Sequence, residues 1–301
     1  MINYKYKNSS PDIIAVAIFI LLTLVSIFNT EINNFFGGFI YYFYTALTII
    51  VFLLGAILLK GKSDVKTKKF FLLKRFKMRM LPITIYAALI VCLLTVLINI
   101  LFVNVFKFTD ALSVNPMSSL NEQSPISSFL AVVLAPAIFE ELFFRGAYFN
   151  SYKSYGIWAF LASALTFGFM HATPFNFIGP VLAGFVFCIL VFIFDSIYPA
   201  ILAHLINNIV VFLLSIYGEK IHSAGLDGFY IIICILILLV LCYLFIGKIT
   251  PYLHKISDKE NVSLKKSITE KTDTKSPFNI WFFALAALWL TKCVLILTKV
   301  I

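Results

Sequence analysis

The sequence predicts an all-α, polytopic membrane protein with eight or nine transmembrane helices around an intramembrane polar cavity. Hydrophobic residues make up 61% of the 301 residues, and charged residues make up only 13%. A soluble domain carries about 25% charged residues, so this composition indicates an integral membrane protein. Largely apolar runs of about 18 residues or more recur along the chain, and each can cross a bilayer about 30 Å thick.

We expect nine apolar segments, of which the fifth and sixth are short and could be tilted, broken or partly re-entrant. They lie near residues 11–29, 37–59, 81–103, 127–149, 156–171, 178–194, 197–217, 228–247 and 279–298. If the spans alternate in direction, four connections with few basic residues lie on the outer side. These connections are residues 30–36, 104–126, 172–177 and 218–227.

The net charge of +10 comes mainly from two basic blocks. Nine of the 24 Lys and Arg residues lie within residues 60–79, and seven more lie within residues 248–275. Both blocks flank membrane spans, which is typical of cytoplasmic loops under the positive-inside rule. The charge therefore predicts a multi-pass protein of the cell membrane with a cytoplasmic N-terminus, and it does not indicate a nucleic-acid partner.

The chain divides into three parts on this reading. Residues 1–124 hold the N-terminal helices and a basic loop at 60–80, with no acid expected deep inside a span. Residues 125–217 hold the candidate functional groups, and residues 218–301 hold the C-terminal helices with a polar linker at 255–277. The five cysteines all lie in predicted spans without CxxC spacing, so we expect packing residues and neither disulfides nor a metal cage.

The basic loop at 60–80 also contains the apolar run Phe70 to Leu73. One interpretation is that the loop only determines the topology of the flanking spans. The other is that it lies on anionic lipid as an amphipathic segment, with its apolar side chains in the bilayer.

Two adjacent acids, Glu140 and Glu141, lie inside the apolar fourth span. A carboxylate in hydrocarbon costs roughly 2.5–3.5 kcal/mol on insertion scales, so the pair needs a compensating reason. Arg145 is four residues after Glu141 and therefore shares its helical face. Pro136 has no backbone N–H, so it leaves the carbonyl of Val132 without its helical donor and favours a kink.

Two further spans of the same part carry imidazoles. His171 ends the fifth span, and His204 and Asn208 share one face of the seventh span because they are four residues apart. A lone histidine, or a His–Asn pair, is also typical of polar contacts that only hold helices together. Asp195 is expected to be a solvated group at a helix end. Carboxylates, imidazoles and an amide within one short stretch favour a functional site over separate packing contacts.

These residues resemble the motifs of the CAAX protease and bacteriocin-processing family of intramembrane endopeptidases, also called the CPBP or Abi group. The family carries E-E-x-x-x-R, F-x-x-x-H and H-x-x-x-N or -D on membrane helices, in this order. The matching positions are Glu140-Glu141-x-x-x-Arg145, Phe167-x-x-x-His171 and His204-x-x-x-Asn208. The resemblance covers roughly residues 125–215, and no motif position departs from the family pattern.

The resemblance implies an amide-hydrolysing site built from all three motifs. Glu140, oriented with His171, would take a proton from the attacking water. His204 and Asn208 would donate hydrogen bonds to the oxyanion that forms on the scissile carbonyl. Arg145 would hold Glu141 in place.

Metal dependence stays open at this point. Glu140, His171 and His204 would make a zinc set with an open fourth position, and the family is often called a metalloprotease. The chain has no H-E-x-x-H sequence, and the resemblance also supports a metal-free mechanism based on glutamate, which we favour over zinc.

The substrates implied by the resemblance are prenylated CAAX tails and leader-bearing peptides such as bacteriocins and pheromones, presented at the bilayer. A bias towards Lys, Asn, Ile and Phe suggests an AT-rich bacterial genome, which favours the second class. Two other functions are compatible with the sequence. One is a non-enzymatic bacteriocin-immunity or signalling-scaffold protein on the same helices. The other is a transporter or proton channel, although we find no internal repeats.

Overall fold

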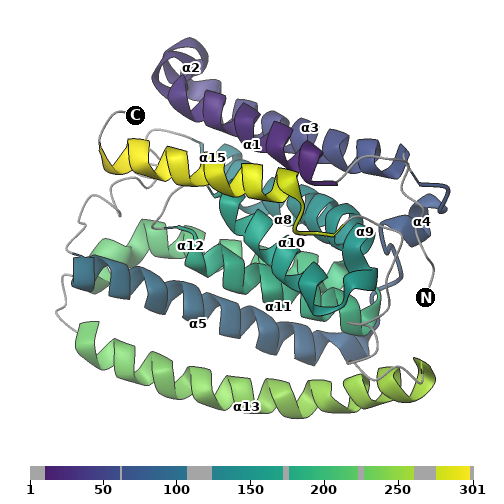
Figure 1. Cartoon of the computed structure of the whole chain (residues 1–301). Helices are drawn as coiled ribbons and strands as arrows, with labels where there is room; N and C mark the ends of the chain where they lie inside the picture. Colours follow the sequence, from purple (N-terminus) through teal and green to yellow (C-terminus); the bar gives the residue numbers. More distant parts are fainter. Residues whose placement is uncertain are drawn as a thin grey trace.

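The computed structural model describes residues 11–61, 63–106, 124–171, 176–222, 227–260 and 276–298. Within these ranges the regular structure is entirely helical, which confirms the predicted all-α class. Figure 1 shows helices from both ends of the chain packed around those of the central part.

Among the described residues, five helical stretches are long and apolar enough to cross a membrane, and four apolar helices are shorter. The long stretches are Asn29–Gly61, Met78–Ile98, Pro125–Tyr155, Ile232–His254 and Ile280–Leu297. The shorter ones are Pro11–Ile27, Ile157–Met170, Ile178–Phe194 and Tyr198–Leu214. Several apolar helices thus indicate a multi-pass membrane protein, whereas the count of eight or nine crossings and the polar cavity stay predictions.

The main helices lie close to the predicted spans. Their bounds are α1 (Pro11–Ile27), α3 (Ile40–Gly61), α5 (Leu81–Phe106), α10 (Ile157–Met170), α11 (Ile178–Phe194), α12 (Tyr198–His222), α13 (Asp227–Glu260) and α15 (Ile280–Leu297). The predicted fourth span is a chain of short pieces: α7 (Pro125–Phe129), the π-helix η4 (Leu130–Leu134), α8 (Ala135–Glu141) and the π-helix η5 (Leu142–Phe149).

Residues 30–36, the predicted connection between the first two spans, form helix α2 (Asn29–Phe36). Its apolar side chains Ile32 and Phe36 pack on a small cluster around Tyr41, and the Phe36 ring stacks on Phe43 at 4.5 Å. The helical path is interrupted between α2 and α3 at Gly37. Its φ of 49° lies in the left-handed region, which glycine adopts without steric cost. Apolar contacts to α3 stabilise a helix in this connection.

The basic loop enters the protein and does not lie on lipid through its apolar residues. It contains helix α4 (Thr67–Phe70), and Phe70, Phe71 and Leu72 are all buried. The amide of Asn150 donates to the carbonyl of Phe70 at 2.7 Å, and the backbone N–H of Ile197 donates to the carbonyl of Leu72 at 3.2 Å. The amphipathic lipid-surface interpretation is therefore wrong for these residues, because their apolar side chains complete the protein core.

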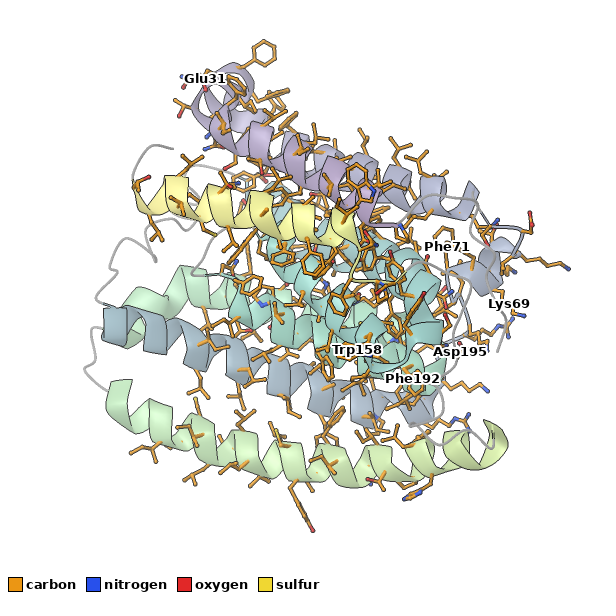
Figure 2. All side chains as sticks on the ribbon, in the orientation of Figure 1. Glu31, Lys69, Phe71, Trp158, Phe192 and Asp195 are labelled. Carbon is orange, nitrogen blue, oxygen red and sulfur yellow. The ribbon has the colours of Figure 1, made fainter. Side chains whose placement is uncertain are left out.

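Asp195 joins this loop to the central part of the chain. It lies between α11 and α12 and forms ion pairs with Lys74 of the loop and with Lys153, the latter at 3.1 Å. Figure 2 shows Asp195, Lys69 and Phe71 at one end of the helices and Glu31 at the opposite end. The Asp195 side chain is 40% exposed, so it is partly solvated, as predicted, and it also pairs with two lysines.

A second buried acid was not expected. Asp12 in the first turn of α1 is fully buried, and its carboxylate accepts hydrogen bonds from the hydroxyls of Tyr148 and Tyr152 and from the amide of Asn279. Thr166 donates in turn to the Tyr148 hydroxyl at 3.1 Å. This Asp12 cluster ties α1 and α15 to the helices of the central part.

Some predictions fall outside the described residues. They are the side of the N-terminus, most of the connection at 104–126 and most of the polar linker at 255–277. The first residues of that linker are described, and they continue helix α13 to Glu260.

Candidate active site

The acids of the first motif lie between two stretches of π-helix. Pro136 stands near the start of α8, directly after η4. The amide of Asn208 in α12 donates to the carbonyl of Val132 at 3.3 Å, four residues before Pro136, which has no N–H. Asn208 therefore links α12 to the π-helix η4 that precedes the proline and the two acids. π-helical turns of this kind are frequent at functional sites.

Glu141 is the centre of the site, and its side chain is completely buried. Its Oε1 accepts one hydrogen bond from Nη1 of Arg145 at 2.7 Å and another from Nδ1 of His204 at 2.9 Å. The structure thus shows the expected pairing of Glu141 with Arg145 and adds a link to α12. Among the described residues, Oε2 of Glu141 has no hydrogen-bond partner.

Arg145 is also completely buried, and aromatic rings surround its guanidinium. The guanidinium carbon lies 4.4 Å from the ring centre of Phe167, 5.2 Å from that of Phe187 and 5.7 Å from that of Phe144. These contacts are within the range of cation–π attraction, which strengthens where water is excluded. Nε and Nη2 have no hydrogen-bond partner within the described part of the chain.

The two imidazoles are each fixed through one nitrogen. His171 directly follows α10, and its Nδ1 lies 3.0 Å from the carbonyl of Phe167, so that nitrogen is the donor. His204 directs Nδ1 at Glu141. Both rings contact Phe167 edge to face, at centroid distances of 4.9 Å for His171 and 5.8 Å for His204. Among the described residues, Nε2 of neither histidine forms a hydrogen bond.

Glu140 differs from its neighbour. It is only partly buried, and the structure gives it no hydrogen bond to any described residue. It lies within electrostatic range of His204, Glu141 and Arg145. A carboxylate with charged neighbours and unused oxygens is able to accept a proton from a bound molecule.

The predicted metal set does not assemble in this structure. In the described residues no group of three or more His, Cys, Asp or Glu side chains is arranged to hold a metal ion. Glu140, His171 and His204 therefore do not fit a zinc site in this conformation. Metal dependence stays a prediction, and no step proposed below passes through a metal.

Two contacts of the site were not predicted. Phe187 touches both Arg145 and His204, but one phenylalanine in a chain with 33 of them gives no sequence signal. Ser163 donates to the carbonyl of Phe144 at 3.3 Å, within the π-helical η5. A search for small polar residues opposite the first motif could have found this second contact.

Comparison with protein families gives a match that covers the segment containing all three motifs. Comparison with curated proteins and with solved structures gives no match. The matching family is described as "Type II CAAX prenyl endopeptidase Rce1-like", and the match extends over residues 122–210, under a third of the chain. This segment, with its buried Glu141–Arg145–His204 cluster, is similar to the CAAX endopeptidases, and the match confirms the resemblance that the motifs predict.

Proposed function

We propose that this protein is an intramembrane endopeptidase that hydrolyses peptide bonds of membrane-presented peptides or protein C-termini. The observation that carries the proposal is the buried contact of Glu141 with both Arg145 and His204, beside a Glu140 that has no hydrogen bond to the described residues. These groups come from separate helices of the segment that matches the endopeptidase family.

Glu140 is the general base in this proposal. It takes one proton from a water molecule as the water oxygen attacks the scissile carbonyl carbon. His171 keeps a lone pair on Nε2 because its Nδ1 donates to the Phe167 carbonyl. That lone pair accepts the second hydrogen of the water and orients the attack.

The negative oxygen of the tetrahedral intermediate is stabilised from α12. In its imidazolium form His204 donates from Nδ1 to the Glu141 carboxylate and from Nε2 to this oxygen. Asn208 uses one amide hydrogen for the carbonyl of Val132 and has a second for the oxyanion. Losing one such donor typically lowers the rate by ~10²–10³.

The step closes when the intermediate collapses. The carbon–nitrogen bond breaks, the protonated Glu140 returns its proton to the leaving amine, and the other product is a new C-terminal carboxylic acid. Water supplies one oxygen of that acid and the scissile carbonyl supplies the other, so the reaction needs no further reactant.

The substrate classes are those that the family resemblance implies. Prenylated CAAX tails and leader-bearing bacteriocin or pheromone peptides both present an extended segment at the bilayer. The Lys, Asn, Ile and Phe bias of the chain supports the leader-bearing peptides.

The test is a comparison of membrane peptides by mass spectrometry between cells with the wild-type protein and cells with Glu140→Gln. We expect at least one peptide product to disappear in the variant at unchanged protein abundance. Glu31→Gln is the matched control, because Glu31 is an exposed acid at the opposite end of the helices (Figure 2). Identical product peptides in the wild type and in Glu140→Gln would favour the non-enzymatic immunity or scaffold role.

A further inference from the structure

Helix α11 is the one main helix within the family-matched segment that carries no residue of the three motifs. It nevertheless contributes two buried residues to the site, Gly184 and Phe187. They are three residues apart and therefore share one helical face. That face contacts Arg145 and His204, which come from η5 and α12.

Phe187 touches both partners of the Glu141 carboxylate. Its ring is fully buried and stacks on the His204 imidazole, with 5.3 Å between the ring centres and 25° between the ring planes. The same ring lies 5.2 Å from the guanidinium carbon of Arg145. One side chain thus contacts a candidate oxyanion donor and the cation that holds its carboxylate.

Gly184 provides space for the guanidinium one turn earlier. A Cβ atom at this position would lie 3.1 Å from Nη2 of Arg145 and 3.1 Å from Cα of Ala164. Contacts this short require a neighbour to move, and Ala164 presents backbone on this side. A side chain at position 184 would therefore displace Arg145 or separate α10 from α11.

The hydrogen bond to Glu141 fixes only part of the orientation of His204. The ring turns about its Cβ–Cγ bond, and one hydrogen bond from Nδ1 restrains that rotation only within the broad angular range of a hydrogen bond. The plane of the ring is defined by a stacked neighbour on its face and by Phe167 edge-on at 88°. Because the ring plane sets the direction of Nε2, the stacked ring controls where the oxyanion donor points.

We propose that Phe187 is a positioning residue, which fixes the plane of the His204 imidazole and the seat of the Arg145 guanidinium. Gly184 makes room for that arrangement. The proposal rests on the proposed function, since it assigns the orientation of a group in the same hydrolytic site.

The kinetic test uses the purified full chain in proteoliposomes with Phe187→Leu. Leucine keeps an apolar side chain but removes the flat face. A misplacement of about 1 Å can cost roughly 100-fold in rate, so we expect kcat to fall roughly 10- to 100-fold while KM changes less than about twofold. Phe194→Leu is the matched control, because Phe194 lies on the same helix and packs on Tyr252 at 5.5 Å, away from the site. Unchanged kcat in Phe187→Leu, or an equal loss in Phe194→Leu, would overturn the proposal.

A second measurement separates this proposal from the proposed function. The rate at which diethyl pyrocarbonate modifies His204 is followed by mass spectrometry in the wild type and both leucine variants. We expect faster modification in Phe187→Leu only, because the stacked ring covers one face of the imidazole. If the wild type cleaves no peptide, the proposed function fails, but this rate still tests the position of His204. Equal rates in all three proteins would count against Phe187.

Discussion

Glu141 and Asp12 are both completely buried carboxylates, yet their surroundings differ. Both oxygens of Asp12 accept hydrogen bonds, from two tyrosine hydroxyls and one amide. Oε1 of Glu141 accepts hydrogen bonds from both Arg145 and His204, while Oε2 has no partner among the described residues. Both oxygens of Asp12 are thus occupied by contacts within the fold, whereas Glu141 keeps one oxygen that can still accept a hydrogen bond.

This difference separates a structural junction from a candidate active site. Buried polar atoms in native proteins are nearly always paired, and each exception needs an explanation. Three such atoms, Oε2 of Glu141 and Nε and Nη2 of Arg145, belong to the ion-paired cluster with His204. A site that binds water and substrate keeps polar atoms that can still form hydrogen bonds, while a junction between helices pairs these atoms within the protein.

The largest stability effect is expected from Arg145→Ala. The substitution leaves the Glu141 charge buried with His204 as its one remaining partner, and loss of one member of a buried ion pair costs about 3–5 kcal/mol. Thermal unfolding of the detergent-solubilised protein measures this loss. Lys69→Ala, at an exposed position, is the control. A loss no larger than in that control would mean that the pair is not a unit of the fold.

A smaller loss is expected from Asp12→Asn, about 2–3 kcal/mol, because the hydrogen bonds of Asp12 have a charged acceptor. The same unfolding measurement applies, together with peptide cleavage per folded molecule. Since Asp12 belongs to the junction and not to the site, kcat should stay close to the wild-type value. A large fall in kcat at full stability would place Asp12 in the catalytic machinery and remove the contrast.

Asn208→Ala is expected to cost about 1 kcal/mol of stability, because the Val132 carbonyl beside Pro136 loses its donor. The substitution also tests the oxyanion role, for which we expect ~10²–10³ lower kcat. Asn207→Ala is the control at the neighbouring position. The Nδ2 group of Asn207 donates only a long hydrogen bond, 3.5 Å, to Oδ1 of Asn208, so its loss should perturb the site little. Equal effects in both variants would contradict a specific role for Asn208.

The smallest effect concerns pH and the loop contact at Asp195. Burial raises the pKa of the Asp195 carboxyl, but the charges of Lys153 and Lys74 outweigh it, so the pKa lies below the ordinary value of 3.8. A lowered pKa contributes stability that is complete above about 3.8 and is lost as the pH falls further, through the folded-state pKa. Because the pair is partly exposed, we expect under about 1 kcal/mol. Unfolding at decreasing pH in wild type and Asp195→Asn measures the difference, which should shrink in acid.

Much of the fold could be predicted because apolar length decides which segments are helical in a membrane protein. The segment predicted at 156–171 is observed as α10 from Ile157 to Met170. The buried run at Phe70 to Leu72 could not be predicted in the same way. An apolar stretch beside basic residues has the same pattern whether it faces lipid or protein.

The site was partly predictable for a related reason. Acids and imidazoles are costly in apolar helices, so Glu140, Glu141, His171 and His204 are conspicuous in the sequence. The pairing of Glu141 with Arg145 follows from helical spacing, and the structure shows it at 2.7 Å. The bond from His204 to Glu141 joins residues 63 positions apart, and helical spacing does not specify such a contact.

The most direct test is cleavage of a membrane-presented peptide by the purified full chain in proteoliposomes, in water labelled with heavy oxygen. We predict that wild type and Asp12→Asn release a product with one labelled oxygen in its new C-terminal carboxylate, and that Glu140→Gln releases none. Labelled product from Glu140→Gln at the wild-type rate would contradict the assignment of this carboxylate as the base.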